Sequence, residues 1–194
     1  MAFIVQNKND GFTIIELLIS MAMIGIILGS VFSLSIAQRT YLSLQEEISE
    51  MTQNTRAAMD MIVGELGMAG YNPTGIVFSG IPYSASQLQI YADLNGNGVL
   101  SDSNENIIYT YDASNKRIVR NTGSGNQPLS ENIQGFFFEY LDDQGNATAV
   151  TTKIKQVRLT ITGRTGKPDS LYASNSGYRT YTLTLLVTPR NFAD

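Results

Sequence analysis

A long apolar run near the beginning of the chain carries one ionisable group. After a short polar segment, residues 12–37 carry an almost continuous series of apolar side chains, and Glu16 is the one ionisable group among them. About 20 apolar residues in a helix suffice to cross the ~30 Å hydrocarbon core of a bilayer. The pattern therefore predicts a membrane-spanning helix with a carboxylate near its beginning, and carboxylates in such places are usually functional.

From residue 38 onward, apolar side chains recur at three- and four-residue steps, which indicates the buried stripe of an amphipathic helix. The stripe consists of Leu44, Ile48, Met51, Thr55, Ala58, Ile62 and Leu66. No proline interrupts either pattern, so we expect one helix from about residue 13 to about residue 68. Residues 12–37 would be its transmembrane half, and residues 38–70 its amphipathic half.

Beyond residue 70 the apolar period changes from that of a helix to the two-residue alternation of a half-buried strand. The clearest strands centre on residues 157–161 and 181–185, and further candidates are residues 88–92, 107–111, 117–120 and 135–141. We expect the Gly- and Ser-containing residues 123–127 to form a loop. The prediction is an α+β architecture, in which a long N-terminal helix packs on an antiparallel β domain formed by residues 71–194.

Composition limits the chemistry that the chain can perform. Its 194 residues contain no cysteine and no histidine, and the net charge is −4. Disulfides, thiol nucleophiles and a Ser-His-Asp triad are therefore excluded, and we predict that the protein is not an enzyme. Acids and bases balance over residues 71–194, and no basic stripe predicts a nucleic-acid partner.

The junction between the polar leader and the apolar run is the most specific motif. A secretory signal has its small-residue cleavage site after the apolar core, whereas here Gly11 stands before it. Gly11, Phe12 and Glu16 at these offsets resemble the type IV prepilin cleavage site. The resemblance implies a type IV pilin fold, removal of residues 1–11 by prepilin peptidase, and N-methylation of Phe12. The alternative is a single-pass signal anchor in which Glu16 is incidental.

The resemblance also gives Glu16 a role. In pilin filaments this acid pairs with the charged N-terminus of a neighbouring subunit, here at Phe12, and the pair fixes the axial register of parallel helices. Thr13 lies beside the pair and can hydrogen-bond to it. The alternative is that Glu16 is tolerated near the interface by snorkelling. Gly25 matches a pilin glycine, but Ser33 stands where pilins have proline, a departure more typical of minor subunits.

Further segments resemble the W-type minor pilins, which are related to the J pseudopilin of type II secretion. These segments are residues 56–66, 68–71, 93–98, 104–107, 109–111 and 189–191. The resemblance implies an inner-membrane, single-pass protein with a periplasmic soluble domain that later enters the pilus at the cell surface. Its partners would be other minor and major pilins and the inner-membrane assembly platform, and its role would be initiation or tip assembly. The alternatives are a J-like pseudopilin, and a pilus-tip adhesin or DNA-uptake module.

One segment of the soluble part has the donors of a metal site. Its beginning, D-x-N-x-N-G, matches the first half of an EF-hand loop, in which alternate residues supply oxygen ligands to calcium. The candidate ligands are Asp93, Asn95, Asn97, Asp102 and Glu105. Asn104 occupies the position where the EF-hand has its second acid, so Asp102 or Glu105 would have to replace it. The alternative is a hairpin loop rich in Asx turns.

Overall fold

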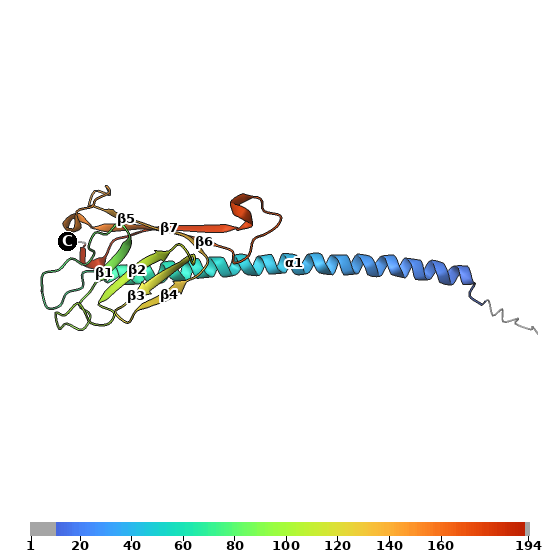
Figure 1. Cartoon of the computed structure of the whole chain (residues 1–194), viewed down its shortest axis with the longest axis horizontal. Coiled ribbons are helices and arrows are strands. Elements are labelled where there is room, and N and C mark those ends of the chain that lie inside the picture. The colour runs from blue at the N-terminus through green and yellow to red at the C-terminus, as the bar shows by residue number, and fades with distance from the viewer. Residues whose placement is uncertain (1–10, 193–194) are drawn as a thin grey trace, which may run out of the picture. The chain divides into compact units, whose positions relative to one another are not determined.

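A computed structural model describes residues 11–192 of the chain (Figure 1). The chain divides into two compact units, one ending at Gln45 and one beginning at Glu46. The predicted leader, residues 1–11, lies outside the described residues except for Gly11.

The predicted helix is present as α1 (Ile14–Gly67), which is continuous over 54 residues. Its buried residues are Met51, Thr55, Ala58, Met59, Ile62 and Leu66, so the predicted stripe is confirmed apart from Leu44 and Ile48, which are half-buried. A turn over residues 68–70 follows the helix, and Gly70 adopts a positive φ of 76° there. The side-chain amide of Asn191 donates to the carbonyl of Ala69 in this turn at 3.1 Å.

The strands form two antiparallel sheets, which confirms the predicted α+β class. The first sheet has the order β1 (Gln87–Tyr91), β2 (Asn106–Asp112), β3 (Arg117–Asn121) and β4 (Asn126–Ser130). The second has the order β5 (Ile133–Leu141), β6 (Gln156–Arg164) and β7 (Thr180–Val187). Within the described part of the chain, short 3₁₀ helices lie in the connections of the second sheet, at Thr151–Lys153 and Ser174–Gly177, and after β7, at Arg190–Phe192.

Two of the strand-level predictions were wrong in detail. Asn126 and Gln127, expected in a loop, begin β4 and pair with Asn121 and Arg120 of β3. Their side chains are exposed, so the strand lacks the alternating apolar signal that would have revealed it. In β7, whose apolar residues were expected to face inward, Leu185 is 43% exposed.

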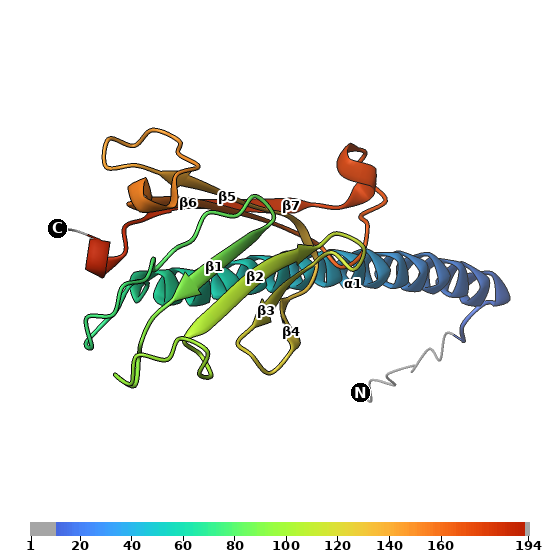
Figure 2. The ribbon, with the colours of Figure 1, turned by 60° about the vertical axis from the view of Figure 1, so that its left-hand side comes forward.

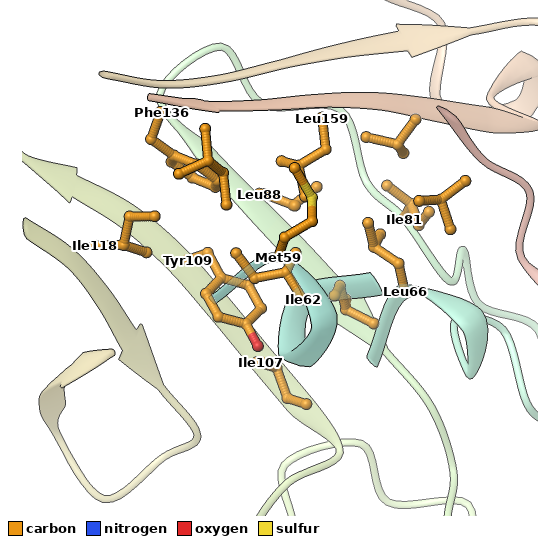
Figure 3. Packing of buried hydrophobic residues seen from close by; sticks show 14 of the residues in the cluster. Met59, Ile62, Leu66, Ile81, Leu88, Ile107, Tyr109, Ile118, Phe136 and Leu159 are labelled. Atoms are coloured by element: carbon orange, nitrogen blue, oxygen red, sulfur yellow. The ribbon is translucent and has the colours of Figure 1, made fainter. Parts of the chain in front are cut away.

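The core of residues 46–192 lies between α1 and the two sheets. The sheets cover different sides of the C-terminal part of α1, and the strands β1 to β4 run obliquely to it (Figures 1 and 2). Met59, Ile62 and Leu66 of α1 point toward side chains of both sheets (Figure 3). The labelled partners are Leu88, Ile107, Tyr109 and Ile118 of the first sheet, and Phe136 and Leu159 of the second.

One glycine allows β6 to approach α1 closely. A Cβ atom built on Gly163 would lie 2.0 Å from the hydroxyl oxygen of Thr55. Thr55 is fully buried, and its hydroxyl donates to the carbonyl of Met51 at 2.7 Å, so it has little freedom to move. Glycine at this position therefore sets how closely the helix and the second sheet pack.

Candidate functional site

The beginning of α1 has a reciprocal capping arrangement. The backbone N–H of Thr13 and its hydroxyl both donate to Oε2 of Glu16, at 2.9 and 2.8 Å. The backbone N–H of Glu16 donates in return to the Thr13 hydroxyl at 3.3 Å. This is the capping box, in which an N-cap Thr and a Glu three residues later each satisfy a free N–H group of the helix terminus. The structure thus brings together two of the predicted assembly residues, Thr13 and Glu16.

The capping box leaves part of the Glu16 carboxylate available. Among the described residues, Oε1 of Glu16 accepts no hydrogen bond. A carboxylate has about four acceptor positions, so an ammonium group can approach this oxygen while Thr13 remains bound to the other. The Glu16 carboxylate can therefore act as a fixed, negatively charged acceptor close to Phe12. The predicted role of Glu16 in fixing the axial register requires such an acceptor.

The described residues leave the predicted cleavage site uncovered. Phe12 is 86% exposed, and no atom lies within 4 Å of a Cβ built on Gly11. The fold of the chain itself therefore does not require glycine at this position. A requirement for glycine would have to come from a molecule that recognises the segment, which fits recognition by a peptidase.

The apolar side chains after Phe12 are not covered by the rest of the chain. Between Ile14 and Leu42 the large apolar side chains are between 52% and 80% exposed. By length and composition α1 suffices to cross a membrane, and the 18-residue window that shows this has a mean hydropathy of 2.4 with none of it buried. So large an apolar surface indicates contact with lipid or with other apolar helices.

The predicted metal-binding segment forms the connection between β1 and β2, and it is ordered by its own side chains. The two oxygens of Asp93 accept N–H groups from Gly96, Asn97 and Gly98 and the hydroxyl of Thr74, at 2.7 to 3.1 Å. Burial alone would raise the pKa of Asp93, but these donors outweigh it and hold the pKa below its ordinary value.

The other predicted donors of this segment divide into two groups. Glu105 is buried and accepts the N–H groups of Leu94 and Asn95 at 2.8 and 2.9 Å. Asp102 instead accepts the side-chain amides of Asn95 and Asn97 at 2.9 and 2.7 Å. Within residues 11–192, no group of three or more His, Cys, Asp or Glu side chains is placed to hold a metal ion.

Sequence reasoning missed one charged cluster, which lies between α1 and the first sheet. Arg120 donates to Glu65 at 2.6 and 3.1 Å, and the hydroxyl of Tyr109 donates to the other Glu65 oxygen. Burial, followed by the Glu65 carboxylate, raises the pKa of Tyr109, and the hydrogen bond with Glu65 raises the pKa of Arg120. The partners lie far apart in the sequence, so no local pattern could have linked them. The cluster attaches β2 and β3 to α1 and has the character of a structural contact.

Comparison with known proteins agrees with the N-terminal arrangement. Residues 6–32 match the family model described as the prokaryotic N-terminal methylation motif. Among solved structures, a type IV-like pilin from Thermus thermophilus is similar at a TM-score of 0.44 and 16% sequence identity, over 77% of this chain and 98% of that chain. No curated protein matches the sequence significantly.

The motif implies processing by prepilin peptidase, anchoring in a membrane, and association with other pilins. It covers Gly11, Phe12 and Glu16, the residues that the sequence singled out. The chain thus carries the prokaryotic N-terminal methylation motif on a long apolar helix that precedes antiparallel sheets.

Proposed function

We propose that this protein is a minor pilin, which acts in the initiation or tip complex of a type IV pilus after cleavage behind Gly11 and methylation of Phe12. The observation that carries the proposal is the arrangement at the beginning of α1. Gly11 and an exposed Phe12 precede a carboxylate acceptor on an apolar helix that the other described residues leave uncovered.

Cohesion in such an assembly comes from the exposed apolar side chains of α1. Burying apolar surface contributes about 25 cal/mol per Å², and a helix with no internal partner can bury its surface only against lipid or other subunits. Glu16 supplies the register, because a slip of one turn would separate its carboxylate from the neighbouring ammonium group at Phe12. The soluble unit then determines which partners the subunit meets.

The assignment to a minor subunit is supported by the sequence of α1. Ser33 replaces the proline that pilins carry, and α1 is helical through both Gly25 and Ser33. W-type minor pilins are related to the J pseudopilin, so the segments that resemble them barely separate the pilus from the secretion pseudopilus. Over residues 71–194 the charge is balanced, so electrostatic attraction does not favour a DNA-uptake function.

The capping box makes a sharp test of Glu16 possible, because glutamine serves in a capping box as glutamate does. We expect Glu16→Gln and Glu16→Ala both to be processed normally and both to be absent from sheared pili, since each lacks the charge. Glu50→Gln, at an exposed acid further along α1, is the control and should enter pili like the wild-type protein. Incorporation of the Glu16→Gln subunit at the wild-type level would show that Glu16 acts as a helix cap only.

A gene deletion distinguishes a role in pilus assembly from the alternative roles in secretion, adhesion or DNA uptake. We expect cells without this protein to carry fewer surface pili and to recover them when the wild-type gene is restored. Normal piliation together with a loss of secreted proteins would assign the chain to a secretion pseudopilus instead. Normal piliation with a loss of adhesion or DNA uptake would assign it to a binding module.

A further inference from the structure

The connection between β1 and β2 contains two buried carboxylates without a cation. Asp93 is fully buried and Glu105 is 2% exposed. Neither takes part in any of the ion pairs between described residues. Four hydrogen bonds compensate the charge of Asp93, whereas Glu105 accepts two, both on one oxygen. Buried charges in proteins are normally paired or coordinate a metal.

Glu105 has an acceptor atom that nothing satisfies. Its Oε1 accepts the N–H groups of Leu94 and Asn95, and these hydrogen bonds hold the carboxylate against the β1–β2 connection. Its Oε2 is buried and has no hydrogen-bond partner among the described residues. A buried acceptor left unpaired costs about 1–3 kcal/mol, and more when it is charged. The arrangement therefore lacks a donor or a cation at this atom.

The loop is already folded around its first carboxylate. Three successive N–H groups point at Asp93, and Gly96 and Gly98 have positive φ values of 72° and 76°, which allow the chain to turn this sharply. The side-chain amides of Asn95 and Asn97 are both held by Asp102. Their oxygens are thereby turned away from Asp102 and accept the N–H groups of Asn97 and Val99.

We propose that the β1–β2 connection binds one calcium ion, with the carboxylates of Asp93 and Glu105 as its charged ligands. The oxygens of Asn95 and Asn97 and backbone carbonyls of the loop would supply further ligands, and Asp102 would be a positioning residue that orients the two amides. Calcium takes 6–8 oxygen ligands in flexible geometry, whereas magnesium demands near-ideal octahedral geometry, so an irregular set of carboxylate, amide and carbonyl oxygens favours calcium.

The site would join two parts of the soluble unit. Thr74 follows α1 in the chain and donates its hydroxyl to Asp93, and the N–H of Asp93 donates to the carbonyl of Tyr71 at 2.8 Å. Pro73 and Ile76 lie against Gly96 and Gly98. A calcium ion here would fix the segment after α1 to the first sheet, in a chain that has no cysteine to form a disulfide.

Titration of the full-length protein in detergent tests the site without reference to pilus assembly. After removal of divalent ions with a chelator, we expect calcium chloride to give saturable heat for one site, with a Kd of about 10⁻⁴–10⁻³ M as in extracellular calcium modules. The thermal midpoint of the soluble unit should rise by a few degrees at saturation, because calcium binds the folded state only.

Three variants complete the test. Glu105→Gln and Asp93→Asn should lower the calcium affinity at least tenfold, whereas Asp143→Asn, at an exposed acid of another loop, should titrate like the wild-type protein. Should Glu105→Gln or Asp93→Asn fail to fold by circular dichroism, the wild-type titration decides alone. Absence of heat from the wild-type protein at 10-fold above this Kd range, an equal response to magnesium, or wild-type binding by folded Glu105→Gln would overturn the proposal. Loss of calcium binding with normal pilus incorporation would leave the proposed function intact.

Discussion

The two units of the chain use the same apolar side chains in opposite ways. In residues 46–192 apolar side chains face one another, and Ile62 is fully buried among residues of both sheets. In residues 11–45 they face outward, and Ile24 is 55% exposed although it has the same chemistry and lies on the same helix. Apolar side chains therefore stabilise the fold in residues 46–192. In residues 11–45 they remain free to contact lipid or other subunits.

Glycines show the same contrast. Gly163 is required because α1 comes so close to β6 that a methyl group would meet Thr55. Gly25 and Gly29 have no atom within 4 Å of a Cβ position. A constraint on residues of the first unit would therefore have to come from outside the chain. The contrast can be tested with matched pairs of variants, one in each unit.

The largest difference should come from paired isoleucine truncations. Ile62→Ala removes buried methyl groups and leaves a cavity, so we expect the soluble unit to lose about 2–5 kcal/mol of unfolding free energy. Ile24→Ala should leave this quantity unchanged within error. Urea unfolding of both full-length variants in detergent, followed by near-UV circular dichroism of the tyrosines, measures the difference. Equal losses would contradict the division of roles.

A smaller difference should come from paired glycine substitutions. Gly163→Ala forces Thr55 and β6 apart, and overpacking of this kind destabilises by about 1–3 kcal/mol. Gly25→Ala should not destabilise, because the site is open and alanine favours helix. Adding Thr55→Ala to Gly163→Ala removes the clashing hydroxyl and should recover part of the loss in the same urea assay. A double variant whose loss equals the sum of the single losses would show that the two residues do not interact.

The capping box gives a local effect of about 1 kcal/mol. Thr13→Val cannot accept the Glu16 N–H or donate through a hydroxyl, so the first turn of α1 should open more often. We expect amide hydrogen exchange of Glu16 and Leu17 in micelles to accelerate about fivefold, the factor that corresponds to this free energy. Exchange at Ile62 should not change. Unaltered exchange at Glu16 would mean that the cap does not stabilise the first turn.

The smallest effect concerns pH. The N–H of Leu171, together with the Arg179 guanidinium, holds the pKa of Asp169 below its ordinary value of 3.8. A lowered folded-state pKa stabilises the fold above pH 3.8, and this contribution is lost as the pH falls through the folded-state value. Asp169→Asn should therefore make unfolding less dependent on pH below about 4. An unchanged acid limb of the stability profile would show that Asp169 contributes nothing measurable.

The periodic elements could be predicted from the sequence because their patterns are local. Three- and four-residue steps located α1, and two-residue alternation located most strands. The beginning of β4 was not predicted, because its exposed residues Asn126 and Gln127 show no apolar alternation. The Glu65–Arg120–Tyr109 cluster was not predicted, because only the fold brings its members together.

The site residues show a similar limit. Gly11, Phe12 and Glu16 stand at offsets that the sequence displays directly, and they lie within the residues that match the methylation motif. Thr13 and Glu16 also have the spacing of a capping box, which is formed within one chain and does not require the predicted pairing between subunits. In the β1–β2 connection, the sequence indicated Asp102 and Glu105 as alternative replacements for the second acid of an EF-hand loop, but it did not distinguish between them. The burial of Glu105 and the amide contacts of Asp102 depend on how the chain folds there.

The central claim is that the apolar beginning of α1 survives maturation and that the mature chain starts at Phe12. Intact and N-terminal mass spectrometry of the protein from cells that naturally produce it tests this directly. The account predicts one mature form that begins with N-methylated Phe12. A mature protein that retains residues 1–11, or that begins beyond the apolar segment, would contradict it.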